Sequence, residues 1–195
     1  GGRMITRMSL TNFKHFKELD IEVGSVTLLV GPNNTGKTTV LQALTLWDLA
    51  LNTWYNQKFD SKARQRTGVT LARQDFYAIP VPETRLLWYG LHTRSGTPGA
   101  TNVLMTMELE GVTDARPWRV GIEYYYANPQ SIYARPKRGL DNPEDIACAL
   151  KERFAFLPPM SGLAAFEERL EEGSIKRRIG EGRTAEVLRN LIWKI

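Results

Sequence analysis

The chain has 195 residues, of which 42% are hydrophobic and 24% are charged, and its formal net charge is +5. This is the composition of an ordinary globular protein with one sizeable core, and its apolar runs are far too short to cross a membrane. The single cysteine, Cys148, excludes an internal disulfide and is expected as a small core residue on a helix. The basic charge balance fits a polyanionic partner such as nucleic acid, and it fits a solvated surface equally well.

The organisation of the chain is simple. We interpret residues 1–3 as the remnant of a cleaved expression tag and residues 4–195 as one continuous portion of a single domain. We find no secretory signal at the start, no internal repeat and no low-complexity tract. The lone cysteine and the lack of a secretory signal predict a cytoplasmic protein.

Three strands are predicted before residue 31. Residues 4–13 mix polar and β-branched side chains, residues 19–23 alternate apolar with acidic side chains, and residues 24–25 turn the chain. Residues 26–30 form a continuous apolar run, as expected of a strand buried on both faces. We therefore expect two strands joined by a short turn, and then a buried strand that leads into a glycine loop.

Apolar residues at helical spacing follow this loop. They predict a helix that packs heavily on one side, and they are Val40, Leu44, Trp47, Leu51 and Trp54. Residues 56–66 are polar and basic, as in a loop or an exposed helix end, and residues 86–92 fit a short helix.

An antiparallel hairpin is predicted in the middle of the chain. Residues 103–110 alternate, residues 118–126 are rich in β-branched and aromatic side chains, and Gly111 with residues 114–117 separates them. Residues 132–133 are expected to add a third strand.

The last part of the chain is mainly helical in pattern. Residues 143–151 predict a helix capped by Asn142 or Asp141. Residues 154–157 predict a short buried strand that two prolines stop, and residues 163–195 predict helices.

The glycine loop has the spacing of a phosphate-binding loop. It satisfies the pattern G-x-x-x-x-G-K-[ST] with Gly31-Pro32-Asn33-Asn34-Thr35-Gly36-Lys37-Thr38. The glycines let the backbone approach phosphates closely, and successive N–H groups of the loop, including those of Asn33, Asn34 and Thr35, form an anion nest at the helix start. The alternative is a glycine-rich turn whose lysine faces solvent.

Three side chains of this loop have expected roles. Lys37 places a cation between the β- and γ-phosphates, and the hydroxyl of Thr38 is a ligand for Mg²⁺. Thr39 is expected to support the α-phosphate side. The predicted cofactors are therefore ATP and Mg²⁺.

The surroundings of the loop resemble a known family. The segment Asn12-Phe13-Lys14-His15-Phe16, the alternating strand at residues 19–23 and the Pro32-Asn33 pair within the loop are similar to the N-terminus of the SMC-, RecF- and OLD-like branch of ABC-type ATPases. The similarity is specific over about the first fifty residues, and beyond them it rests on strand order alone.

This resemblance implies an α/β P-loop NTPase fold. The chain would be the N-terminal lobe of an ABC/SMC-type head, with a mixed sheet, an antiparallel β subdomain and an incomplete nucleotide-binding domain. By the same resemblance, Lys14 and His15 lie near the bound nucleotide; surface polarity on a turn is the alternative for both. Such heads dimerise with ATP between them, and DNA and a nuclease are the implied partners.

Parts needed for ATP hydrolysis are missing from the sequence. No run of four apolar residues ends in Asp-Glu, and the fragment at residues 160–163 lacks the second glycine and the glutamine of a signature motif, so we interpret it as a loop. Gln130 lies in a turn and is not assigned as a Mg²⁺-sensing glutamine. Either the chain is an N-terminal fragment or another polypeptide supplies the second half; the apolar end at residues 193–195, without a glycine cap, favours truncation.

Two basic clusters are candidate contacts for DNA phosphates. The first contains Arg135, Lys137 and Arg138, and the second contains Lys176, Arg177 and Arg178. Each also fits a solvated helix face or loop. The tyrosines at residues 124–126 favour sheet packing over base stacking, because alternation places the middle ring opposite the other two. One cysteine and two histidines give no zinc-ligand spacing.

These observations lead to two hypotheses of different classes. The first is the ATP-binding region of an SMC/RecF/OLD-like ATPase that acts on DNA in repair or defence and hydrolyses ATP only as part of the complete protein. The second is a regulatory or interaction module in which nucleotide is a structural ligand. A small-molecule kinase is disfavoured by the early antiparallel strands.

Overall fold

The computed structural model describes residues 2–32, 35–58, 67–76, 78–96, 101–152, 154, 167–180, 183 and 186–193. Some predictions fall outside these residues. They concern Asn33 and Asn34 of the phosphate loop, the strand residues 155–157 and the fragment at residues 160–163.

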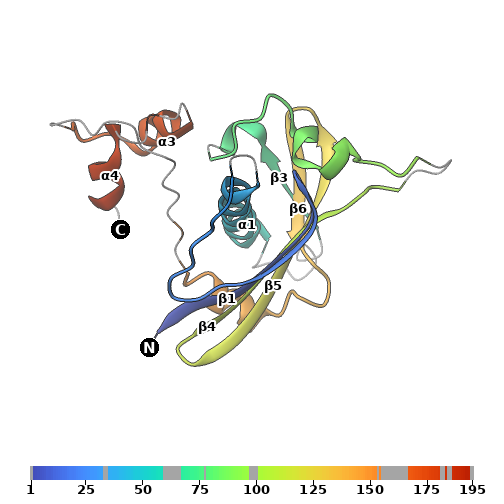
Figure 1. The fold of residues 1–195 in the computed structure, drawn as a ribbon, viewed down its shortest axis with the longest axis horizontal. Coiled ribbons are helices and arrows are strands. Elements are labelled where there is room, and N and C mark those ends of the chain that lie inside the picture. The colour runs from blue at the N-terminus through green and yellow to red at the C-terminus, as the bar shows by residue number, and fades with distance from the viewer. Residues whose placement is uncertain are drawn as a thin grey trace.

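Six strands form one sheet within the described residues, in the order β2-β1-β4-β5-β6-β3 (Figure 1). Their bounds are β1 Arg3–Phe13, β2 Phe16–Glu22, β3 Val69–Ala72, β4 Met105–Thr113, β5 Arg116–Asn128 and β6 Ser131–Pro136. The predicted strand pair at the N-terminus, the central hairpin and its third strand are confirmed. Strand β3 was not predicted, because its four residues are too few for a clear alternation.

The segment at residues 26–30 contradicts the prediction of a doubly buried strand. It forms no strand, and Val26, Leu28 and Val30 are 90%, 83% and 83% exposed. A strand buried on both faces needs hydrogen-bonded neighbours and a covering layer on each side. No strand of the described sheet pairs with this segment, and every pairing in that sheet is antiparallel, so the expected mixed sheet is not found among the described residues.

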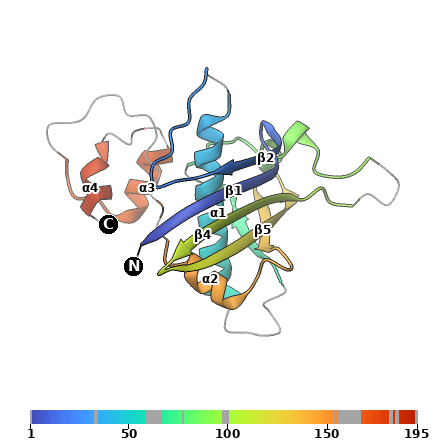
Figure 2. The same ribbon diagram turned by 60° about the horizontal axis from the view of Figure 1, so that its bottom comes forward.

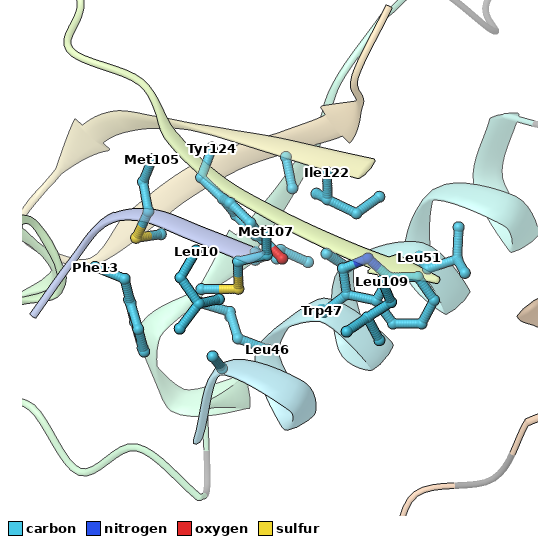
Figure 3. Packing of buried hydrophobic residues seen from close by; sticks show 14 of the residues in the cluster. Leu10, Phe13, Leu46, Trp47, Leu51, Met105, Met107, Leu109, Ile122 and Tyr124 are labelled. Carbon is cyan, nitrogen blue, oxygen red and sulfur yellow. The ribbon is translucent and has the colours of Figure 1, made fainter. Parts of the chain in front are cut away.

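Helix α1, Lys37–Lys58, packs its apolar stripe against one face of the sheet (Figure 2). Of the predicted stripe, Leu44 is half-buried and the rest is buried. Trp47 lies at the centre of the contact: its Nε1 donates to the carbonyl of Val120 at 3.3 Å, and its ring stacks on Trp118 with centroids 6.3 Å apart. Figure 3 shows Trp47 among buried side chains that come from both the helix and the sheet.

Strand β4 shows how the sheet divides core from solvent. Met105, Met107 and Leu109 are fully buried, whereas the alternate positions, which include Glu108 and Glu110, are only partly buried. The tyrosines of β5 pack as predicted within the protein. Tyr124 is fully buried, the ring of Tyr125 lies 4.8 Å from the guanidinium of Arg135, and Tyr126 meets Trp88 edge-on at 6.1 Å.

The remaining elements surround this framework. Helix α2, Pro143–Ala149, has the predicted cap, since the Asn142 side chain accepts a hydrogen bond from the Glu144 amide at 2.9 Å, and it buries Cys148 as expected. Three short 3₁₀ segments are η1 Arg73–Asp75, η2 Thr84–Leu87 and η3 Tyr89–Leu91.

Two helices follow near the C-terminus. They are α3, Glu172–Gly180, and α4, Leu188–Trp193, and they lie to one side of α1 (Figures 1 and 2). Their buried apolar residues form a separate small cluster of Ile175, Ile179 and Val187. Across the described helices, none is long and apolar enough to cross a membrane.

Candidate nucleotide-binding site

The phosphate loop joins the exposed segment at residues 26–30 to the first turn of α1. Gly36 closes the loop with a φ of +90°, a conformation that glycine adopts readily and other residues resist. A Cβ atom on Gly36 would also lie 2.9 Å from Cε2 of Phe16, the residue that opens β2. The β1–β2 hairpin therefore presses an aromatic ring onto the backbone of the loop.

The ammonium group of Lys37 folds back over the loop. Its Nζ donates to the carbonyl oxygens of Gly31 and Pro32, the second at 2.6 Å. The hydroxyl of Thr35 donates to the same Pro32 carbonyl at 2.9 Å. Neutral carbonyls are weaker acceptors for an ammonium than phosphate oxygens are. If a polyphosphate binds at the loop, we expect Lys37 to exchange these carbonyls for phosphate oxygens.

The start of α1 adds a second source of positive potential. The first hydrogen bond of the helix runs from the Val40 amide to the Gly36 carbonyl at 3.0 Å, so the amides of Lys37, Thr38 and Thr39 have no acceptor within the helix. The first turn contains no acidic side chain that would neutralise the positive end of the helix dipole. An anion is the matching ligand for this end of the helix.

Thr38 and Thr39 differ in exposure. Thr38 is exposed at the helix start, whereas Thr39 is only 6% exposed. The hydroxyl of Thr38 is a hard oxygen ligand that suits Mg²⁺, which keeps several waters and takes its other ligands from substrate phosphates. Among the described residues no cluster of acidic, histidine or cysteine side chains forms a separate metal site. The exposed Thr38 hydroxyl is therefore the candidate protein ligand for Mg²⁺ at this loop.

The β1–β2 hairpin tip is strained and firmly held beside this loop. Asn12 and Lys14 both adopt positive φ angles, of 57° and 48°. Such conformations persist in non-glycine residues only where the surroundings enforce them. Here the Asn12 amide donates to the Leu104 carbonyl at 2.9 Å, and the Lys14 backbone N–H donates to the Leu87 carbonyl at 2.8 Å. These contacts hold the side chain of Lys14 against α1.

The ammonium of Lys14 is half-buried and hydrogen-bonded to an amide. Its Nζ donates to Oε1 of Gln42 on α1 at 2.7 Å. Burial lowers the pKa of Lys14 to about 8. The structure thus brings Lys14 to the helix that carries Lys37, while His15 is exposed at the hairpin tip. Their contact with nucleotide stays a prediction.

The first basic cluster is largely neutralised within the sheet. Arg135 pairs with Glu123 at 3.0 Å, and Lys137 pairs with Glu108, which also pairs with Arg119 at 2.8 Å. These bonds join β4, β5 and β6 on the face of the sheet opposite the core. Cross-strand ion pairing therefore explains Arg135 and Lys137 without DNA.

The second basic cluster is also partly paired. Lys176 pairs with Glu172 at 2.8 Å along α3, and Arg178 approaches Glu186 at 3.6 Å. Exposed pairs of this kind are weak and would not prevent a phosphate contact. A role for this cluster in DNA binding stays a prediction.

Two residues at the site were not predicted as functional. The sequence pattern gives Phe16 only as part of a motif, and it gives no role to Gln42. Gln42 lies on the buried side of α1 with 8% exposure, which is unusual for a glutamine. A glutamine on the apolar side of a predicted helix was the signal from which its role could have been found. Its partners come from segments distant in sequence, so sequence periodicity could not reveal them.

Comparisons with known proteins agree with this geometry. Residues 4–76 match the AAA ATPase domain family. A stretch of 43 residues is 42% identical to the OLD nuclease of Thermus scotoductus and covers 22% of this chain and 8% of that protein. A stretch of 41 residues is 49% identical to the DNA replication and repair protein RecF of Roseiflexus castenholzii and covers 20% of this chain and 10% of that protein.

The N-terminal region of the chain is therefore similar to an ATPase domain over residues 4–76. More narrowly, the resemblance to the SMC-, RecF- and OLD-like ATPases that the hairpin and the loop carry is confirmed by these similarities. The matched stretches span a tenth or less of the length of either relative.

Proposed function

We propose that this chain binds ATP with Mg²⁺ through the phosphate loop and the first turn of α1, as the N-terminal lobe of a P-loop NTPase head. The observation that carries the proposal is the position of Lys37. Its ammonium donates to two carbonyl oxygens of the loop, and it lies at the start of α1, where the first N–H groups have no acceptor within the helix. Phosphate oxygens satisfy both sets of donors at once. Lys14 contributes a second cation from the hairpin.

Mg²⁺ would be held by the hydroxyl of Thr38, phosphate oxygens and water. Bound there, it would neutralise charge on the phosphates. The exposed Thr38 side chain at the start of α1 supports this arrangement.

The head is proposed to be completed by further β-structure. Val26, Leu28 and Val30 expose three large apolar side chains immediately before the loop. Exposed apolar patches of this kind mark interaction surfaces. An added strand along this segment would bury its apolar side chains, as the composition predicts. The same added structure would supply the apolar run ending in Asp-Glu that this sequence lacks and that hydrolysis needs.

We further propose that complete heads dimerise around ATP and act on DNA. This part rests on the relatives, one of which is named a nuclease and the other a DNA replication and repair protein. It does not rest on the first basic cluster, since Arg135 and Lys137 are paired within the sheet.

Calorimetry with ATP and Mg²⁺ tests the central proposal. We expect the chain to bind ATP but to hydrolyse it very slowly. Lys37→Ala should weaken binding by at least about tenfold, because charged hydrogen bonds of this kind contribute about 1.5–3 kcal/mol. Lys17→Ala is the matched control, since Lys17 is an exposed lysine on β2.

Two outcomes would contradict the proposal. One is the absence of ATP binding by the unaltered chain, and the other is equal binding by the Lys37→Ala variant. Brisk hydrolysis that depends on Lys37 would instead show that this chain contains its own carboxylate for activating water.

A further inference from the structure

Gln42 connects three segments of the protein around the side chain of Lys14. Its Oε1 accepts from Lys14 Nζ at 2.7 Å, and its Nε2 donates to the Ala78 carbonyl at 3.0 Å. An ammonium can only donate and a carbonyl can only accept, so this pair of contacts fixes which way the amide points. Gln42 is itself 8% exposed, and its amide is therefore held in one orientation by buried contacts.

Lys14 depends on this amide for the placement of its charge. Within the described part of the chain, Gln42 is the only side chain found to accept a hydrogen bond from Nζ, and no ion pair of Lys14 is present. The ring of Phe13 lies 6.0 Å from Nζ, so the two groups found near this ammonium among the described residues are both neutral. One of its three N–H donors is used by Gln42, and the others can reach an anion.

The hairpin carries this ammonium to the phosphate loop. Phe16, two residues beyond Lys14, packs on Gly36, and Gln42 lies five residues after Lys37 on the same helix. Five residues of helix rise about 7–8 Å along the axis, so the ammonium held at Gln42 lies between one and two turns along α1 from Lys37. The strained backbone of Lys14, with a φ of 48°, directs its side chain to this point.

We propose that Gln42 is a positioning residue for nucleotide binding: it holds the Lys14 ammonium in place beside the phosphate loop, so that the charge of Lys14 contributes to ATP affinity. This inference rests on the proposed function and adds to it a residue that acts through Lys14. Because the contact is an amide rather than a carboxylate, Lys14 keeps its charge available for phosphate oxygens.

The pH dependence of ATP affinity provides the test. Burial lowers the pKa of Lys14 to about 8, so free Lys14 loses its proton above that pH. We expect affinity for ATP with Mg²⁺, measured by calorimetry between about pH 7 and pH 9.5, to fall by about tenfold once the ammonium deprotonates. Lys14→Met should be about tenfold weaker at the lower pH and should lose this decline.

Two substitutions of Gln42 should move the onset of this decline in opposite directions. Gln42→Glu places a carboxylate on Nζ, raises the pKa of Lys14 and moves the onset to higher pH. Gln42→Leu removes the acceptor, lowers that pKa further and moves the onset to lower pH. Gln57→Glu is the control, because Gln57 is exposed near the other end of α1. It should leave the onset unchanged.

A structural role alone would lower thermal stability without moving the onset. An onset in Gln42→Glu equal to that of the unaltered chain would overturn the inference, as would a Lys14→Met variant that keeps the full decline. Either result would leave the proposed function intact if Lys37→Ala still weakens ATP binding as expected. The absence of ATP binding by the unaltered chain would overturn both proposals.

Discussion

Replacing Gly36 by alanine should destabilise the protein at the contact between the hairpin and the phosphate loop. Two independent costs arise at this position. The φ of +90° disfavours any side chain, and the new methyl group would lie 2.9 Å from Cε2 of Phe16. A positive φ in a non-glycine residue costs about 1–3 kcal/mol, and overpacking costs a similar amount. Because Phe16 is only half-buried and can move, we expect the ring contact to cost about 1 kcal/mol.

Gly139 allows the two costs to be separated. Its φ is +86°, close to that of Gly36, but a Cβ atom there would meet nothing within 4 Å. Gly139→Ala should therefore show the backbone cost alone. The difference between the two variants in the free energy of unfolding, measured by urea denaturation, estimates the ring contact.

A double-mutant cycle with Phe16→Ala gives a second estimate. If the ring opposes the new methyl group, Gly36→Ala should cost about 1 kcal/mol less in the Phe16→Ala background than in the unaltered chain. Costs that add within about 0.5 kcal/mol, or a Gly36→Ala variant no less stable than Gly139→Ala, would refute the packing of Phe16 on the loop.

Three further predictions concern buried polar groups. Tyr124→Phe should leave the free energy of unfolding unchanged or raise it by up to about 1 kcal/mol, because the buried hydroxyl has no hydrogen-bond partner among the described residues; a clear loss in urea denaturation would mean that it has one. Burial raises the pKa of Asp48 to about 6, so the ionised form is disfavoured in the fold, and stability should fall as pH rises from about 4 to about 6. Asp48→Asn should remove that slope in a pH series of thermal melts and should be more stable at pH 7; an unchanged slope would exclude Asp48 as its source. Burial opposes ionisation of Glu108, but hydrogen bonds from Lys137 and Arg119 hold its pKa below the usual value, so its contribution to stability is present at neutral pH and is lost as pH falls through the lowered pKa. Glu108→Gln should cost about 1 kcal/mol at pH 7, and the cost should shrink in high salt and disappear in acid; a cost independent of pH and salt would point to packing instead.

Local patterns were sufficient for several parts of this protein. The helix after the glycine loop was predictable because its 3.6-residue period lies within residues 40–54. The phosphate-binding role of the loop is predicted in the same way, from the glycine spacing and the lysine within residues 31–38. The alternation of β4 and the cap of α2 were predictable for the same reason: each depends on neighbours a few residues apart. The family resemblance also rests on one continuous segment, residues 4–44.

The environment of each element depended on segments far apart in the sequence. Lys14 was expected near the nucleotide, but its contact with Gln42 joins residues 28 positions apart, and Arg135 meets its partner Glu123 across two strands. Ion pairing of this kind depends on strand register, which fixes the residue opposite each side chain. A basic cluster in sequence was therefore largely neutral in the sheet.

The segment at residues 26–30 shows the same division most clearly. Its apolar composition alone predicts that other parts of the protein should bury it on both faces. Whether it is covered depends on a neighbouring strand, and in the described fold Val26, Leu28 and Val30 remain exposed beside the loop. Sequence thus determined the helix after the glycine loop and predicts the chemistry of that loop, whereas the tertiary structure decided which surfaces meet, because burial depends on the partner as well as on the residue.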